Sequence, residues 1–282
     1  MNYSQLWHKL AQLYDDGEAK AIARMVYEVR YQLSLSDILL GKDTQLSADD
    51  QKELEEIAER LLQNEPVQYV LGKADFCGRT FHVAPGVLIP RPETEELCQW
   101  IISEFRNFGI PEYRNDSILD IGTGSGCIAI TLAAELAGTK VCAWDISEEA
   151  LKIARKNAEN LHVNIDFQQV DILQAGKGIE TYSLIVSNPP YICLQERAGM
   201  EQNVLSYEPK TALFVPDNNP LLFYRAIVHY ATTALKDAGW LYFEINPLYA
   251  DEIREMLCSM RFSHIDIKKD QYGKQRMIRA QR

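Results

Sequence analysis

The chain has 282 residues, of which 46% are hydrophobic and 24% are charged. These fractions are typical of soluble globular proteins and exclude a disordered tail, a collagen-like fibre and a coiled-coil rod. At roughly 150 residues per domain, the length favours two domains or one large domain with an appendage. The net charge of -11 argues against a protein that grips a long nucleic-acid duplex, because such a protein needs a basic face.

Targeting and metal-binding signals are missing from the sequence. No stretch approaches the roughly 18 uncharged apolar residues of a membrane-spanning helix, and the first residues lack the basic start and apolar core of a signal peptide. The six cysteines form no Cys-x-x-Cys pair, and no histidine stands at zinc-ligand spacing. We therefore expect a cytoplasmic protein with free thiols, no metal site and no membrane contact.

The N-terminal part has the pattern of a helical bundle. From residue 3 to residue 63, apolar residues recur at helical spacing, with breaks at two glycine turns. Ser47 precedes an acidic turn and a further apolar run, which predicts a capped helix that ends before Pro66. Residues 1–66 are therefore predicted to form an N-terminal helical domain.

The next segment, residues 67–92, is interpreted as a linker. Glycine and proline recur along it, and apolar residues alternate at Phe81 and Val83 and again at Val87 and Ile89. This pattern predicts short strands or a β-hairpin between two domains.

Residues 93–282 alternate between strand-like and helix-like segments. Such alternation predicts the α/β class: a doubly wound, mainly parallel sheet with helices on both faces. The strand-like runs cover residues 117–120, 140–144, 163–170, 182–186 and 240–245, and the clearest helix-like runs cover residues 127–136, 150–160 and 221–235.

A glycine-rich turn follows the first of these strands. It reads Asp120-Ile121-Gly122-Thr123-Gly124-Ser125-Gly126. Glycines there let the backbone turn tightly and let a ligand approach closely. The Gly-x-Gly-x-Gly spacing, with Cys127 next, does not match the dinucleotide pattern Gly-x-Gly-x-x-Gly and disfavours NAD.

Two aspartates follow at later strand ends. Asp145 can accept hydrogen bonds from ribose hydroxyls, and Asp171 can accept one from an exocyclic amine. A plain turn with helix-capping aspartates is the alternative interpretation, which the coincidence of three signals disfavours. The arrangement resembles the S-adenosylmethionine site of Rossmann-like methyltransferases.

A second motif, Asn188-Pro189-Pro190-Tyr191, follows the fourth strand-like run. Consecutive prolines fix φ and keep their predecessors extended, so this tetrapeptide is a stiff loop. The Asn188 side-chain oxygen and the Pro189 carbonyl can accept both N–H groups of a target NH₂, while Tyr191 packs on its flat face. A nitrogen held in this way can point at a sulfonium methyl, so the pattern predicts methyl transfer to an amino or amide nitrogen.

Two further sets of residues carry a resemblance to a known family. The first, in the linker, comprises Pro66–Gly72, Phe76, Gly78, Phe81 and Pro85–Glu95. The second, downstream, comprises Tyr207-Glu208-Pro209, Ala212-Leu213, Gly239, Glu244, Asp270, Gly273, Lys274 and Arg276. Together they cover residues 66–279 and resemble the HemK/PrmC family, the protein-(glutamine-N5) methyltransferases that act on peptide-chain release factors.

The resemblance implies an N-terminal bundle that engages a release factor, a β-hairpin linker and a catalytic domain whose last strand is antiparallel. It implies that S-adenosyl-L-methionine is the cofactor, held by Gly122, Thr123, Gly124, Ser125, Gly126, Asp145, Asp171, Ile172 and Asn188. It also implies that the glutamine of a Gly-Gly-Gln motif is received by the catalytic residues Asn188, Pro189, Pro190 and Tyr191. Ile172 departs from relatives with an aromatic residue there, so the adenine would pack on an aliphatic group.

Some roles and substrates remain open in the sequence. Arg91, Glu93 and Glu95 are interpreted as part of a turn and an acidic helix start. Methyltransferases that modify glutamine in ribosomal proteins share the Asn-Pro-Pro-Tyr motif, those that modify exocyclic amines of DNA or RNA resemble the catalytic half, and a non-enzymatic cofactor-binding module is a third alternative. Residues 1–72 hold 7 Lys/Arg against 13 Asp/Glu, which suits a basic protein partner, whereas residues 261–282 hold 7 against 2. On balance the sequence predicts a release factor as the substrate and no direct DNA substrate.

Overall fold

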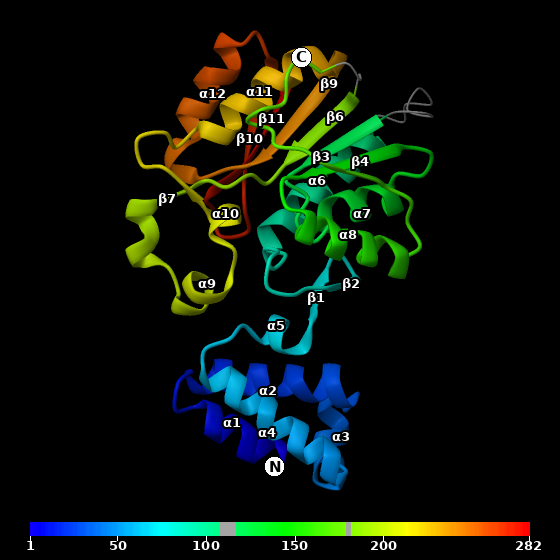
Figure 1. Ribbon diagram of the computed structural model, residues 1–282, viewed down its shortest axis with the longest axis vertical. Helices are drawn as coiled ribbons and strands as arrows, with labels where there is room; N and C mark the ends of the chain where they lie inside the picture. The colour runs from blue at the N-terminus through cyan, green and yellow to red at the C-terminus, as the bar shows by residue number, and fades with distance from the viewer. Residues whose placement is uncertain (108–116, 179–181) are drawn as a thin grey trace. The chain divides into compact units, whose positions relative to one another are not determined.

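The computed structural model describes residues 1–107, 117–178 and 182–282 (Figure 1). They divide into two compact units, one formed by Met1–Lys73 with Glu201–Tyr207 and the other by Ala74–Met200 with Glu208–Arg282. A short segment from far along the chain therefore belongs to the N-terminal unit. Within the described residues, no helix combines the length and the apolar character that crossing a bilayer requires.

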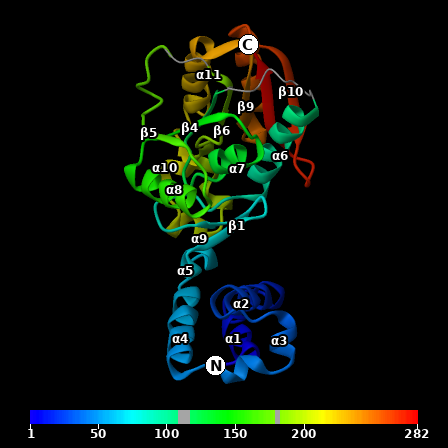
Figure 2. The ribbon, with the colours of Figure 1, turned by 90° about the vertical axis from the view of Figure 1, so that its right-hand side faces the viewer.

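The first unit is a bundle of short helices around one apolar core, as predicted (Figures 1 and 2). Side-chain caps define several helix starts: Ser47 accepts a hydrogen bond from the backbone N–H of Asp50, as its position before the acidic turn predicted. In α9, the Tyr207 hydroxyl donates to the Gln63 carbonyl at 2.9 Å, which attaches the distant segment to this unit. Its helices are α1 (Tyr3–Leu10), α2 (Asp16–Tyr31), α3 (Leu35–Leu39), the 3-10 helix η1 (Lys42–Gln45), α4 (Ala48–Leu62), α5 (Val67–Leu71) and α9 (Gln202–Tyr207).

The predicted linker contains a helix as well as a hairpin. Pro66 precedes α5, which ends at Gly72 in the left-handed conformation. Strands β1 (Lys73–Phe76) and β2 (Arg79–His82) then pair across a two-residue turn whose residues both have positive φ. The segment around Val87 and Ile89 is buried but forms no strand. The alternation there reflects packing rather than sheet pairing.

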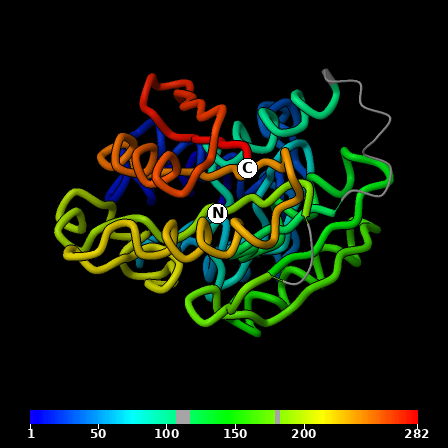
Figure 3. Tube along the Cα trace, turned by 90° about the horizontal axis from the view of Figure 1, so that it is seen from above, coloured from blue at the N-terminus to red at the C-terminus, as the bar shows by residue number. Residues whose placement is uncertain are grey.

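A seven-stranded sheet forms the centre of the second unit, in the order β10-β11-β9-β6-β3-β4-β5. Strand β11 is antiparallel to both of its neighbours, whereas β9, β6, β3, β4 and β5 run parallel, so the predicted antiparallel last strand is confirmed. Strands β10 and β5 form its two edges (Figure 3). The strands are β3 (Ser117–Ile121), β4 (Lys140–Asp145), β5 (Asp166–Gln169), β6 (Tyr182–Ser187), β9 (Leu235–Glu244), β10 (Ser263–Lys269) and β11 (Gln275–Gln281).

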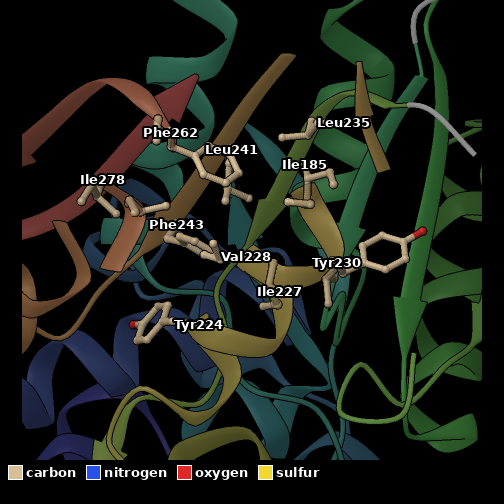
Figure 4. Close-up of a cluster of buried hydrophobic side chains, with 14 of the residues drawn as sticks. Ile185, Tyr224, Ile227, Val228, Tyr230, Leu235, Leu241, Phe243, Phe262 and Ile278 are labelled. Carbon is tan, nitrogen blue, oxygen red and sulfur yellow. The ribbon is translucent and has the colours of Figure 1, made fainter. Parts of the chain in front are cut away.

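Helices cover both faces of this sheet, which confirms the predicted α/β architecture (Figure 1). Because side chains alternate along a strand, Ile118 and Leu119 of β3 enter two different cores. One face carries α6 (Pro92–Asn107), α7 (Cys127–Glu135) and α8 (Glu148–Asn160), and the other carries α11 (Leu222–Ala234) and α12 (Ala250–Ser259). On the α11 side, Tyr224 and Phe243 pack edge to face with ring centroids 5.2 Å apart (Figure 4).

Shorter elements connect the sheet to its surroundings. They are β7 (Ile192–Cys193), the 3-10 helix η3 (Leu194–Gly199), α10 (Lys210–Leu213), β8 (Phe214–Val215) and the 3-10 helix η4 (Pro247–Tyr249). Strand β5 is shorter than the predicted run of residues 163–170. Val163 still donates to the Ala158 carbonyl at the end of α8, and His162 before it has a φ of 56°, so the chain extends only afterwards.

Asn157 ties the hairpin to the glycine-rich loop. Its Nδ2 donates to the carbonyls of His82 and Ser125, both at 2.9 Å, and its Oδ1 accepts from the His82 N–H at 2.7 Å. Asn157 is buried, so losing these bonds leaves unpaired polar groups in the interior.

We therefore expect Asn157→Ala to lower the free energy of unfolding by about 2–4 kcal/mol. Asn160→Ala is the matched control, because Asn160 is exposed at the end of the same helix and should change stability by no more than about 0.5 kcal/mol. Urea unfolding monitored by circular dichroism measures both. Equal stability of the two variants would contradict the assigned role.

Candidate active site

The ends of three parallel strands bring the predicted site residues together. In the sheet register, Ile121 of β3 lies opposite Trp144 of β4 on one side and Ser187 of β6 on the other. The next residues along the chain are the first glycine of the loop, Gly122, after Ile121, then Asp145 after Trp144 and Asn188 after Ser187. A cavity of about 350 Å³, formed wholly by the second unit, lies at this edge. Its lining includes Gly122, Thr123, Gly124, Ser125, Asp145, Asp171, Ile172, Asn188, Pro189 and Pro190.

The three loop glycines have different roles. Gly122, Gly124 and Gly126 have φ values of 77°, 56° and 83°, a region that favours glycine. A Cβ built on Gly122 or Gly124 meets no atom within 4 Å, so these two positions leave open space beside the backbone. A Cβ on Gly126 would lie 2.9 Å from Ile130 and 3.2 Å from Ala154. Gly126 does not line the cavity, and it instead lets α7 and α8 approach each other.

Asp120 accepts hydrogen bonds from the glycine loop and from α7. Its Oδ2 accepts hydrogen bonds from the Thr123 hydroxyl at 2.6 Å and from the Ala129 N–H at 3.2 Å. The side chain is fully buried, and this burial raises its pKa to about 7. Asp120 therefore joins the loop to the start of α7 at the cost of an ionisable group in the interior.

Asp145 connects the loop to the end of β4. Its Oδ2 accepts from the Gly124 N–H and its Oδ1 from the Ser147 N–H, both at 2.9 Å. Burial raises the pKa of this carboxyl group. Each carboxylate oxygen has a further lone pair, so Asp145 can still accept hydrogen bonds from a ligand in the cavity.

Asp171 and Ile172 lie two and three residues beyond the end of β5. Asp171 accepts from the Leu173 N–H at 2.9 Å and from the Gln174 side chain at 2.7 Å, which holds its carboxylate at the cavity wall. Ile172 lines the same wall and packs against the core cluster on the α11 side. The cavity wall is therefore aliphatic at Ile172, the position at which the sequence analysis noted the absence of an aromatic residue.

The Asn188–Tyr191 motif is anchored at both ends. The Nδ2 of Asn188 donates to the Thr94 hydroxyl oxygen at 3.1 Å, and Thr94 donates to Glu244 Oε2 at 2.6 Å. The Tyr191 hydroxyl donates to Glu244 Oε1 at 2.9 Å, and burial and this carboxyl group raise the pKa of Tyr191. Tyr191 does not line the cavity, and it packs against the core cluster on the α11 side.

Thr94 and Glu244 are site residues whose roles the sequence analysis missed. Glu244 ends β9, and the preceding residue, Phe243, lies opposite Ser187 in the register. Since Asn188 likewise follows Ser187, the rule that identified Asp145 and Asn188 applies to Glu244 as well. Thr94 belongs to the first turn of α6, and no local pattern links it to a strand end. The aromatic residues Phe214 and Phe223 also reach the cavity without having been assigned to it.

The charged residues near Pro90 lie at a turn and at an acidic helix start, as interpreted, and Arg91 also lines the cavity. Arg91 forms an ion pair with Glu208 at 2.5 Å, and the Glu208 side chain is buried. Glu208 also accepts from the Ile89 N–H at 3.3 Å. Glu93 and Glu95 lie in the first turn of α6, where acidic groups favour the helix dipole. The Arg91–Glu208 pair thus joins two segments that line the cavity.

Comparison with known proteins identifies the family. The model of the PrmC N-terminal domain matches residues 5–72, and that of the methyltransferase small domain matches residues 102–206. A release factor glutamine methyltransferase of Bacteroides thetaiotaomicron is 48% identical over 97% of this chain and 96% of its own length. The corresponding protein of Flavobacterium psychrophilum is 44% identical over 99% of this chain and 98% of its own length. This chain belongs to the release factor glutamine methyltransferase family.

Solved structures agree with a methyltransferase fold. The catalytic domain of hMettl16, in complex with MAT2A 3'UTR hairpin 6, aligns with a TM-score of 0.54 at 19% identity and covers 76% of this chain and 78% of that chain. The T. thermophilus 16S rRNA methyltransferase RsmC, in complex with AdoMet and guanosine, aligns with a TM-score of 0.53 at 19% identity and covers 74% of this chain and 49% of that chain. At this identity the likeness concerns the fold alone. The predicted resemblance to release factor glutamine methyltransferases and the predicted Rossmann-like methyltransferase fold are both confirmed.

The raised pKa of Asp120 predicts how the stability of this release factor glutamine methyltransferase family member depends on pH. Between the unfolded pKa of about 4 and the folded pKa of about 7, the folded state binds the proton more strongly than the unfolded state does. This site therefore makes the free energy of unfolding fall as pH rises through that window, by at most about 1.4 kcal/mol per pH unit.

Asp120→Asn cannot ionise, so its free energy of unfolding, relative to that of the wild type, should rise from about pH 4 to about pH 7. Urea unfolding at several pH values measures this difference. Asp166→Asn makes the same chemical change at an exposed aspartate of β5 and serves as the control. Parallel curves for Asp120→Asn and the wild type would show that Asp120 is not the source.

Proposed function

We propose that this chain transfers a methyl group from S-adenosyl-L-methionine to the side-chain amide nitrogen, N5, of the glutamine in the Gly-Gly-Gln motif of peptide-chain release factors. The observation that carries the proposal is the placement of Asn188, which lines the cavity with its side-chain nitrogen bound to Thr94. Its Oδ1 is consequently the part of the amide that can accept a hydrogen bond from a target nitrogen.

The cavity fits the methyl donor of this enzyme family, S-adenosyl-L-methionine. Gly122 and Gly124 leave space for close approach to the backbone, Asp145 has acceptor capacity for ribose hydroxyls, and Asp171 has it for an exocyclic amine. Val87, Ile146, Ile172 and Leu173 supply apolar surface around them. When bound, the cofactor supplies an electrophilic methyl group on a sulfonium centre.

The protein contributes orientation to the reaction. An amide nitrogen is a poor nucleophile because its lone pair is delocalised, so a strong base alone would not aim it. Asn188 Oδ1 and the Pro189 carbonyl are proposed to accept the two N–H groups of the target amide, which fixes the plane of the amide and draws positive charge away from the nitrogen. Pro189 and Pro190 keep this part of the backbone stiff. In this scheme Tyr191 holds the motif through Glu244.

The substrate assignment is supported by the curated relatives, whose names specify release factor glutamine methylation and whose lengths this chain covers almost completely. We assign release-factor recognition to the N-terminal unit, whose sequence matches the PrmC N-terminal domain model. Residues 1–72 hold 7 Lys/Arg against 13 Asp/Glu, so a basic partner surface would be attracted over a distance, in a salt-dependent way. The reaction is proposed to take place in the cytoplasm.

The decisive experiment is an incubation of purified protein, labelled S-adenosyl-L-methionine and a purified release factor, followed by peptide mass spectrometry. We expect one added methyl group on the glutamine of the Gly-Gly-Gln motif and none when that glutamine is replaced by glutamate. Asn188→Ala should lower turnover by about a hundredfold or more, with cofactor affinity nearly unchanged, and Asn160→Ala should behave as the wild type. Efficient transfer to ribosomal protein, DNA or RNA, with none to release factor, would refute the substrate assignment.

Asp145→Asn tests the cofactor site separately. The substitution replaces one carboxylate oxygen of Asp145 by an NH₂ group, which then faces either the N–H of the loop or the ribose hydroxyls. We therefore expect S-adenosyl-L-methionine to bind about 10- to 150-fold more weakly. Isothermal titration calorimetry measures the dissociation constant, and circular dichroism verifies folding. Asp166→Asn is the control at an exposed strand position outside the cavity lining. Unchanged affinity in folded Asp145→Asn would remove Asp145 from the cofactor site.

A further inference from the structure

We propose that Thr94 and Glu244 are positioning residues that fix which end of the Asn188 amide faces the substrate. The inference deepens the proposed function and rests on it, because it concerns the group that receives the target nitrogen. Glu244 ends β9, Thr94 lies in the first turn of α6 and Asn188 follows β6, so three separate elements converge on this chain of hydrogen bonds.

The direction of the hydrogen bonds follows from the chemistry of the three groups. Glu244 accepts at both carboxylate oxygens, from the Tyr191 hydroxyl at Oε1 and from the single proton of the Thr94 hydroxyl at Oε2, 2.6 Å away. The Thr94 oxygen can then only accept from Asn188. The Asn188 atom at 3.1 Å from it must therefore be the NH₂ nitrogen, and Oδ1 takes the opposite side.

The need for such a lock comes from the symmetry of an amide side chain. The two ends of the Asn188 amide have nearly the same shape, so packing distinguishes them poorly, and the prolines restrict the backbone but not this side-chain rotation. A flipped Asn188 would present N–H groups to the N–H groups of the target amide. The hydroxyl of Thr94 supplies the polarity that excludes the flipped state.

Burial shows that the arrangement is built into the interior. Thr94 is 3% exposed and Glu244 is 1% exposed. A carboxylate at such a place is costly, and burial raises the pKa of Glu244, whereas the positive charge of Arg276 lowers it. The same carboxylate accepts from Tyr191, so both ends of the Asn188–Tyr191 motif depend on one group. Perturbed ionisable groups of this kind cluster at functional sites.

Two substitutions at Thr94 separate positioning from packing. Thr94→Val keeps the branched shape and removes the hydroxyl, whereas Thr94→Ser keeps the hydroxyl and removes a methyl group. We expect Thr94→Val to lower kcat by about 10- to 100-fold, with the S-adenosyl-L-methionine dissociation constant within about twofold and the KM for release factor within a few-fold of wild type. Thr94→Ser should retain kcat within a few-fold of the wild-type value.

A second readout does not need turnover. The side-chain NH₂ resonances of Asn188 can be assigned in a ¹⁵N spectrum by their loss in Asn188→Asp. Thr94→Val should shift these resonances and speed their exchange with water, while Thr94→Ser should leave them near their wild-type positions.

The outcomes decide the inference. Wild-type kcat and unshifted Asn188 resonances in Thr94→Val would overturn it, and so would equal losses of kcat in Thr94→Val and Thr94→Ser, which indicate packing. If the wild type methylates another substrate and not the release factor, the proposed function fails, and the same Thr94 variants assayed on that substrate decide the positioning role. If no substrate is turned over, the resonances alone decide it.

Discussion

The parallel pairing of β3 with β4 and β6 is the constraint on which the site depends. Hydrogen bonding places Ile121, Trp144 and Ser187 side by side, so the residues that follow them emerge together at one sheet edge. Adding β9 to the row places Glu244 beside Asn188. Residues more than a hundred positions apart in sequence therefore form one cavity without a local motif to connect them. The helices on both faces keep this row of strand ends fixed.

The glycine loop, in turn, depends on groups behind it. Gly126 lets two helices approach, Asn157 binds the carbonyl of Ser125, and Asp120 binds the Thr123 hydroxyl. Burial of Asp120 and Asp145 costs stability near neutral pH, since it raises the pKa of both groups. The loop therefore obtains its stiffness from buried polar groups that an apolar core would not contain, a pattern expected where a site must stay open and ordered.

The sequence predicted most of the second unit because apolar strands and glycine turns carry local signals. Asp145 and Asn188 were found because each follows an apolar run. Sequence reasoning missed Thr94, whose partner lies 150 positions away, and it missed the hydrogen bond from Tyr191 to Glu244, which the tetrapeptide alone cannot reveal. It also predicted that β5 starts at Val163, whose N–H still donates to the Ala158 carbonyl of α8. It did not predict α5, which is too short for helical periodicity to show.

The chemistry of the cavity limits what it can distinguish. Two acceptors, which the proposed scheme takes from Asn188 and Pro189, would receive any planar NH₂ group, and glutamine, asparagine and the exocyclic amines of bases all present one. The proposed hydrogen bonds from Thr94 and Glu244 fix the orientation of the Asn188 amide, and through it that of the target NH₂ group. They do not distinguish the molecule to which this NH₂ group is attached. Under the proposed function, selection of a release factor would come from contacts made outside the cavity, where a folded partner is recognised by shape and charge. The N-terminal unit suits that proposed role, because the excess of acidic residues in positions 1–72, 13 Asp/Glu against 7 Lys/Arg, would attract a basic partner surface.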